Sequence, residues 1–287
     1  MKQWIGRFEP HEGVVCPGFH RLRYLAECPH GCAMCYLQGT YWRGRPRDIT
    51  EADLEEMERR VARWMRQRDR EDPWGSPGRV LNAGELSDSF APDICAQASQ
   101  RLIELFRRQE RHTLLLVTKA QDERLMEIEP TNQVIVSFSL TDDRSAVQNL
   151  QLTNVAWPLA AIGWRTRYRL DPLLRLTDAT HLAGMVALAP HHPERITLGT
   201  LRFTAHTYQM MTKGTPAQRA LAELVTKQQD GGSHPYRLPF EQRVEIYGKA
   251  LEMLRPLGCE VGLCKEVPAV FVALGFEPRE NRCNCQP

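Results

Sequence analysis

The sequence lacks several features that would place it in a broad class of protein. No apolar run approaches the roughly 20 residues that a membrane-spanning helix needs, so we expect no membrane partner. No signal-peptide pattern opens the chain, and its nine cysteines are therefore expected to stay reduced in the cytoplasm. The formal net charge of +2 gives no overall indication of a polyanionic partner. No internal repeat or low-complexity tract is visible.

The sequence does contain enough apolar residues for a large core. Its 287 residues are 42% hydrophobic, which suits one large α/β domain or two small ones. The nine cysteines do not form one even framework, because they gather in two groups near the two ends of the chain. Cys16 and Cys95 stand apart from both groups, and Cys95 is expected to be a small buried hydrophobic residue in a helix.

The first cysteine group consists of Cys28, Cys32 and Cys35, with the spacing C-x3-C-x2-C. Three thiolates are too few for a structural zinc site, which takes four protein ligands, and one too few for a cluster held by four cysteines. A 4Fe–4S cluster bound by three cysteines keeps one iron open for a group that is not protein. The alternative is a zinc site completed by His30, in a non-catalytic protein that binds nucleic acid.

The array continues with Tyr36, and the stretch C-Y-L-Q that begins at Cys35 resembles the radical S-adenosylmethionine superfamily, in particular its spore photoproduct lyase branch. The resemblance extends over roughly residues 23–285. It implies that the three cysteines hold a 4Fe–4S cluster whose open iron binds S-adenosylmethionine. An electron donor such as flavodoxin or ferredoxin would then drive reductive cleavage to a 5′-deoxyadenosyl radical, which abstracts hydrogen from a substrate.

Alternating strands and helices predict the fold class. Buried strands separated by helical stretches are typical of a parallel sheet. With the resemblance, they predict an α/β protein with an incomplete (β/α)6 barrel of the TIM type over residues 1–204. The strands are expected at residues 19–27, 80–83, 112–118, 133–140, 164–170 and 196–203.

Helices are expected to begin at a capping box on Thr50 and Asp53 and to span residues 92–108. The first of them should end at the turn-rich residues 72–78. A C-terminal extension, residues 205–287, carries the second cysteine group. Its elements are expected to be helices at 216–227 and 240–257 and a last strand at 260–264.

The segment after the second strand, from Gly84 to Asp88, is assigned to the cofactor. A glycine directly after a strand lets the backbone approach a ligand, which gives Gly84 its place in cofactor binding. The lyase branch has C-T-S-D here; its serine meets S-adenosylmethionine, and its cysteine supplies the hydrogen atom that finishes repair. Ser87 is retained, but Glu85 replaces that cysteine. The resemblance therefore places Glu85, with Tyr36, in the catalytic and cofactor site, without the thiol that dimer repair uses.

Two later strand ends complete the cofactor site that the resemblance implies. The family's V-T-K lysine, which meets the cofactor carboxylate, corresponds to Lys119, and a serine of the next strand corresponds to Ser137.

The second cysteine group contains Cys259, Cys264, Cys283 and Cys285. We expect three of them, Cys264, Cys283 and Cys285, to hold a second iron–sulfur cluster with an open iron for substrate. A structural zinc site and unligated cysteines remain the alternatives.

Arginines give the indication of a substrate. Arg165, Arg167 and Arg169 alternate along one strand, so they share a face that either points into the barrel or faces water. An inward arginine set suits a phosphate or carboxylate substrate. A further run of arginines ends the helix that begins at Thr50, either as a solvated face or in contact with nucleic acid. A nucleic-acid substrate is the leading hypothesis, and a peptide or small metabolite is the alternative.

Overall fold

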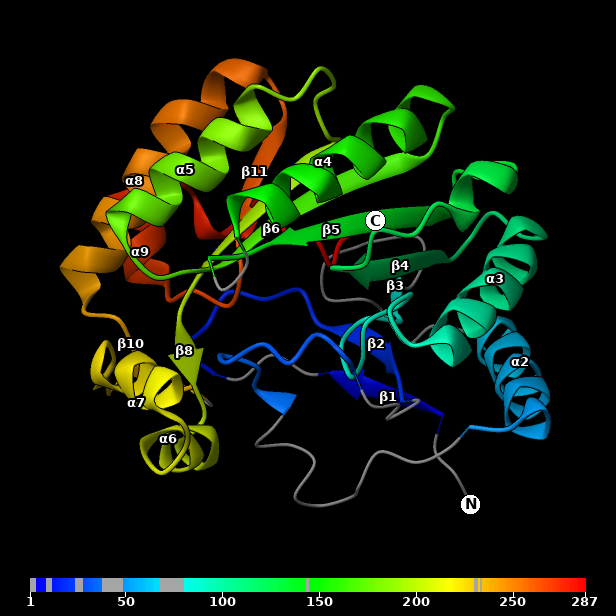
Figure 1. Ribbon diagram of the computed structural model, residues 1–287, viewed down its shortest axis with the longest axis horizontal. Coiled ribbons are helices and arrows are strands. Elements are labelled where there is room, and N and C mark those ends of the chain that lie inside the picture. The colour runs from blue at the N-terminus through cyan, green and yellow to red at the C-terminus, as the bar shows by residue number, and fades with distance from the viewer. Residues whose placement is uncertain are drawn as a thin grey trace.

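The computed structural model describes the chain except for residues 1–3, 9–11, 24–27, 38–48, 68–79, 143–144, 230–231 and 233. Its centre is an eight-stranded sheet whose outer face is covered by helices (Figure 1). The strands of this sheet are β1 (Ile5–Phe8), β2 (Phe19–Leu22), β3 (Val80–Asn82), β4 (Thr113–Thr118), β5 (Val134–Leu140), β6 (Arg165–Leu173), β7 (Arg195–Thr200) and β11 (Glu260–Leu263).

The sheet is largely parallel, as predicted. Its strand order is β1-β2-β3-β4-β5-β6-β7-β11; β1 pairs antiparallel with β2, and all other neighbours are parallel. All six expected strands are present as β2 to β7, although the end of the first expected strand lies outside the described residues. The sheet has two strands more than the six predicted for the barrel. They are β1, which pairs antiparallel with β2, and β11, the last strand expected at residues 260–264, which pairs parallel with β7. In the described residues β1 and β11 do not pair, so the sheet is open between them.

Most of the helices lie between successive parallel strands of the main sheet. The described helices are α2 (Glu51–Arg66), α3 (Asp93–Arg107), α4 (Ala146–Ala161), α5 (Leu176–Ala187), α6 (Ala205–Thr212), α7 (Pro216–Glu223), α8 (Phe240–Leu254) and α9 (Pro268–Ala273), with a 3-10 turn η2 (Arg124–Glu127) between β4 and β5. The exceptions are α6 and α7, which lie between β8 (Arg202–Phe203) and β9 (Thr226–Lys227), and α9, which follows β11. None of the helices among the described residues combines the length and apolar character needed to cross a membrane.

The predicted helix boundaries are correct where local signals are strong. Thr50 accepts from the amide of Asp53 at 3.3 Å, and the Asp53 carboxylate accepts from the amide of Thr50 at 3.2 Å, which confirms the capping box. Gly258 has φ 71° just after α8 and its 3-10 extension, as a C-terminal glycine should. The expected turn at residues 72–78 lies outside the described residues.

The part of the chain between β7 and α8 forms a small second sheet. It has the order β8-β10-β9, formed by β8 (Arg202–Phe203), β9 (Thr226–Lys227) and β10 (Tyr236–Arg237), all antiparallel. The helix predicted for residues 216–227 is therefore too long: α7 ends at Glu223, and its last predicted residues form β9.

The C-terminal tail covers the inner face of the main sheet. Asn284 donates to the Ser137 hydroxyl at 2.9 Å, and Arg167 donates to the Asn284 carbonyl at 2.9 Å. The tail passes so close to β11 that a Cβ on Gly262 would lie 2.1 Å from the carbonyl oxygen of Arg282. Figure 1 accordingly shows the C-terminus beside β5. The C-terminal tail thus occupies the space on the inner face of the sheet.

Candidate active site

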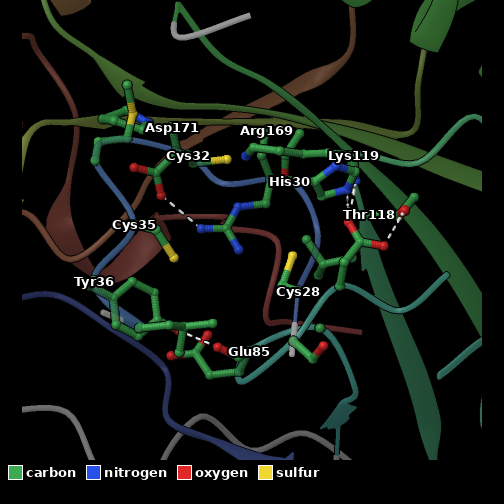
Figure 2. Close-up of a pocket in the computed structure, with 18 of the residues that line it drawn as sticks. Cys28, His30, Cys32, Cys35, Tyr36, Glu85, Thr118, Lys119, Arg169 and Asp171 are labelled. Carbon is green, nitrogen blue, oxygen red and sulfur yellow. Dashed lines mark hydrogen bonds and ion pairs between the residues drawn. The ribbon is translucent and has the colours of Figure 1, made fainter. Parts of the chain in front are cut away.

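A cavity of about 210 Å³ opens at the carboxyl ends of the parallel strands. Its wall includes Thr118 of β4, Ser139 of β5, Arg169 of β6 and Thr200 of β7. Figure 2 shows the cavity with the cysteine loop along one side. Side chains from several parallel strands meet at this edge of the sheet, which is where α/β barrels and related parallel sheets carry their chemistry.

All three cysteines of the first group line this cavity (Figure 2). The amide of Cys35 donates to the carbonyl of Cys32 at 3.1 Å, which closes a turn between them. Burial raises the pKa of Cys28, while backbone amides of His30 and Asp88 donate to its sulfur and oppose that rise. The motif therefore presents three thiols to one space.

Among the described residues no three His, Cys, Asp or Glu side chains converge closely enough to hold one metal ion. Zinc needs such convergence, whereas the cysteines of a 4Fe–4S cluster bind different irons and stand further apart. Moreover, His30 points one ring nitrogen, Nε2, at Asp88 rather than at a thiol.

Asp88 ties the cysteine loop to the sheet. Its carboxylate lies 3.0 Å from His30 Nε2 and accepts from the Thr118 hydroxyl at 2.7 Å and from the amides of Lys119 at 2.6 Å and Phe90 at 2.9 Å. Burial opposes ionisation of Asp88, but the hydrogen bonds from His30, Lys119 and Phe90 hold its pKa below the usual range. A charged carboxylate therefore fixes the loop at His30, between the first two cysteines.

Tyr36, Glu85 and Ser87 all lie in the wall of the cavity. The hydroxyl of Tyr36 donates to the backbone carbonyl of Glu85, which joins the cysteine loop to the segment after β3. The Glu85 side chain is 11% exposed, and its Oε1 lies 3.7 Å from Nζ of Lys265. Ser87 accepts a weak hydrogen bond from Cys95 at 3.7 Å; Cys95 is fully buried, which confirms its expected packing role.

Gly84 lines the cavity, but close backbone packing, rather than the approach of a ligand, explains why a glycine is needed there. A Cβ at this position would lie 2.5 Å from both Cβ and the carbonyl oxygen of Val117. Only glycine lets the segment after β3 pack directly on β4.

Lys119 lines the cavity, but Ser137 does not. Ser137 is fully buried and accepts from Asn284 of the C-terminal tail. Ser139 lies two residues further along the same face of β5 and does line the cavity. Ser137, the serine assigned by resemblance, therefore lies two residues before the part of β5 that faces the cavity.

The arginines of β6 share one face, as the alternation predicted, but only Arg169 lines the cavity. Arg165 and Arg167 both donate to the carboxylate of Glu194, and the fully buried Arg167 also donates to the Asn284 carbonyl. Burial is the main cause that lowers the pKa of Arg167 to about 10. Arg165 and Arg167 thus stabilise the sheet and the tail, which leaves Arg169 as the substrate candidate.

Arg169 belongs to a charged group in the wall of the cavity. Asp171 accepts from Arg169 at 2.7 Å and from Arg202 at 3.2 and 3.1 Å. Burial opposes the ionisation of Asp171, but the two guanidinium groups hold its pKa well below the usual range. Gly199 makes room for this carboxylate, since a Cβ there would lie 2.4 Å from it.

The second cysteine group does not form an open site in the described structure. Cys264 lies 3.3 Å from Nη2 of Arg202, and Cys285 is hydrogen-bonded to Cys283 within the tail. None of the three thiols lines the cavity. Cys16 lies near this group, because the charges of Cys264 and Cys285 add to the burial that raises the pKa of its thiol. The second cluster expected from the sequence stays a prediction.

Four residues of the site were not predicted. They are Asp171 within β6, Arg202 within β8, and Asp88 and Lys265 a few residues after β3 and β11. A position near the carboxyl end of a strand is the one signal that could have found them, but their pairing depends on strand order.

These residues fit the cofactors that the resemblance implies. Three thiols at one cavity are the donor set of a 4Fe–4S cluster with an open iron, and Lys119 provides a cation for a carboxylate in the same space.

Comparison with known proteins reveals a structural relationship without a sequence one. No protein-family model and no curated protein sequence matches the chain. A solved mutant of spore photoproduct lyase with dinucleoside spore photoproduct matches with a TM-score of 0.61 and 16% identity, over 83% of this chain and 75% of that chain. Another mutant, with bound AdoMet and the dinucleoside photoproduct, has a TM-score of 0.57 and 16% identity, over 80% and 72%. The chain therefore has the fold of spore photoproduct lyase, a radical S-adenosylmethionine enzyme.

Proposed function

We propose that the protein is a radical S-adenosylmethionine enzyme that abstracts hydrogen from a substrate. One observation carries the proposal: Cys28, Cys32 and Cys35 line one cavity at the carboxyl ends of parallel strands, in a fold like that of spore photoproduct lyase. When bound and reduced, the cluster supplies the electron that cleaves S-adenosylmethionine to methionine and a 5′-deoxyadenosyl radical.

The chain's own residues bind and orient these groups. The three cysteines hold the cluster, and Asp88 fixes their loop through His30. Lys119 pairs with the cofactor carboxylate, and Ser87 hydrogen-bonds beside it. The surrounding wall limits the access of water, which protects a reactive radical. The electron comes from a partner of the flavodoxin or ferredoxin type.

The substrate proposed first is a nucleic acid, because the similar solved structures hold a dinucleoside photoproduct. A peptide or small metabolite is the alternative, since the chemistry of the radical does not itself select the substrate.

Metal content tests the proposal directly. Protein purified without oxygen is expected to be brown and to contain about four iron and four sulfide per chain, as one 4Fe–4S cluster requires. The measurement is iron and sulfide analysis with a visible absorption spectrum. A colourless protein with about one zinc per chain would refute the proposal and favour the structural zinc alternative.

Loss of the Lys119 ammonium should weaken cofactor binding. A Lys119→Ala variant is expected to bind S-adenosylmethionine about 10- to 150-fold less tightly, because a hydrogen bond to a charged group contributes about 1.5–3 kcal/mol. Isothermal titration under nitrogen measures the change. The matched control is Lys213→Ala, which removes an exposed lysine just after α6 and should bind as the wild type does. Unchanged affinity in Lys119→Ala would mean that Lys119 does not bind the cofactor carboxylate.

A further inference from the structure

Lys265 has an unusual backbone at the edge of the cavity. It lies two residues after the end of β11 and lines the cavity, and it is the only non-glycine residue with a positive φ (53°) in the described part of the chain. Lysine has no intrinsic preference for this left-handed conformation. Such strained residues persist where surrounding contacts impose them, and they gather at functional sites.

A buried network imposes this conformation from the next residue. Glu266 is fully buried, and its carboxylate accepts from Arg243, from Arg237 at 3.3 Å and from Tyr247 at 2.9 Å. Arg237 also donates to the carbonyl of Lys265 at 2.9 Å. These contacts hold the peptide group that joins Lys265 to Glu266. The backbone from which the Lys265 side chain extends is therefore fixed at the cavity wall.

Two contacts position the ammonium of Lys265, but they do not use all of its N–H donors. Its side chain is 15% exposed, and Nζ lies 4.3 Å from the centre of the Phe8 ring, within the range of a cation–π contact. The Glu85 carboxylate, 3.7 Å away, is too far for a hydrogen bond. An ammonium has three N–H donors, so it can still donate to a ligand in the cavity.

The wall around Lys265 has an excess of positive charge. Among the described residues there, three cations, Lys265, Arg169 and Arg202, face two carboxylates, Asp171 and Glu85. All three cations come from the neighbouring strands β6, β7 and β11 or from the residues just after them. The Nε atom of Arg169 is buried and has no hydrogen-bond partner in the described structure. Figure 2 shows the Arg169 side chain extending into the cavity.

We propose that Lys265, together with Arg169, binds one oxyanion of the substrate, either a phosphate or a carboxylate. This deepens the proposed function, on which it rests, by giving the substrate a negative charge that lies beside β6 and the end of β11. Lys265 provides the donors, and the group of Arg169, Asp171 and Arg202 provides a fixed positive field behind them. Lys119 is a separate cation, assigned to the cofactor.

Anion binding by the protein purified without oxygen tests this proposal. Inorganic phosphate and acetate are the two probes, each titrated calorimetrically into the wild type, Lys265→Met and Lys213→Met. We expect Lys265→Met to bind the tighter probe about tenfold more weakly, as loss of a charge-assisted hydrogen bond predicts, and Lys213→Met to match the wild type. The tighter probe identifies the oxyanion as phosphate or carboxylate. Equal affinity in Lys265→Met and the wild type, or no binding of either probe, would overturn the proposal.

Two further variants keep the test independent of folding. Glu85→Gln removes the carboxylate that competes for Lys265, so the probe should bind about two- to fivefold more tightly, the usual worth of a partly exposed ion pair. Lys265→Arg keeps the charge and should retain most of the affinity. Weaker or unchanged binding in Glu85→Gln would contradict the assignment.

A separate measurement distinguishes this proposal from the proposed function. The wild type is assayed without substrate for 5′-deoxyadenosine. If it forms none but binds the anion through Lys265, the proposed function fails and the anion site stands. If it forms 5′-deoxyadenosine while Lys265→Met binds both probes normally, the anion site fails and the proposed function stands.

Discussion

A Cys32→Ala variant is expected to form no 5′-deoxyadenosine above background when the reduced protein is incubated with S-adenosylmethionine. The wild type should form it slowly even without substrate. Three thiolates are the whole ligand set of the proposed cluster, and no further cysteine lies between residues 17 and 94 to replace one of them. Chromatography of 5′-deoxyadenosine and methionine, with iron analysis of the same samples, measures the loss.

The matched control is Cys259→Ala, which removes a half-buried thiol just before β11 and outside the cavity. This variant should retain both iron and cofactor cleavage. Normal cleavage by Cys32→Ala protein that has lost its cluster would refute the assignment of the cysteine loop.

The parts of the fold predicted correctly depend on signals within short stretches of sequence. β4 and β5 are continuous buried apolar segments, and the capping box at Thr50 needs only four residues. The cysteine spacing is equally local. Helix α4 begins with a capping box at Ser145 and Gln148, but its interior obscures the helical pattern. It contains no charged residue, its apolar side chains show no clear face, and Pro158 lies inside it.

The parts that could not be predicted depend on which distant segments meet. The C-terminal tail covers Ser137 and occupies Arg167, so the serine and the arginine that face the cavity are Ser139 and Arg169 instead. Periodicity places residues on a face but does not say how far along a strand the open space begins. Likewise Asp171 could pair with Arg202 only once β6 and β7 were known to be neighbours.

Spore-type thymine dimers are expected to remain unrepaired by this protein, even where it cleaves S-adenosylmethionine normally. In the lyase branch that the sequence resembles, a cysteine returns a hydrogen atom to the product radical, and Glu85 stands in its place here. A carboxylate can accept hydrogen bonds or exchange protons, but it does not donate a hydrogen atom as a thiol does. In the described wall of the cavity the only thiols are Cys28, Cys32 and Cys35, which the proposed cluster would bind. Cys264 and Cys285 lie outside this wall.

The assay incubates reduced enzyme, S-adenosylmethionine and a dinucleotide that contains the dimer, and it measures thymine released as monomer units. The wild type should give no release above background while it forms 5′-deoxyadenosine. Glu85→Cys restores a thiol at the position facing Lys265, and Glu85→Ser is its matched control, because it removes the carboxylate without adding a thiol. Release by Glu85→Cys but not by Glu85→Ser would identify the missing thiol as the reason. Efficient release by the wild type, unchanged in Glu85→Gln, would instead show that dimer repair proceeds here without a cysteine at this position.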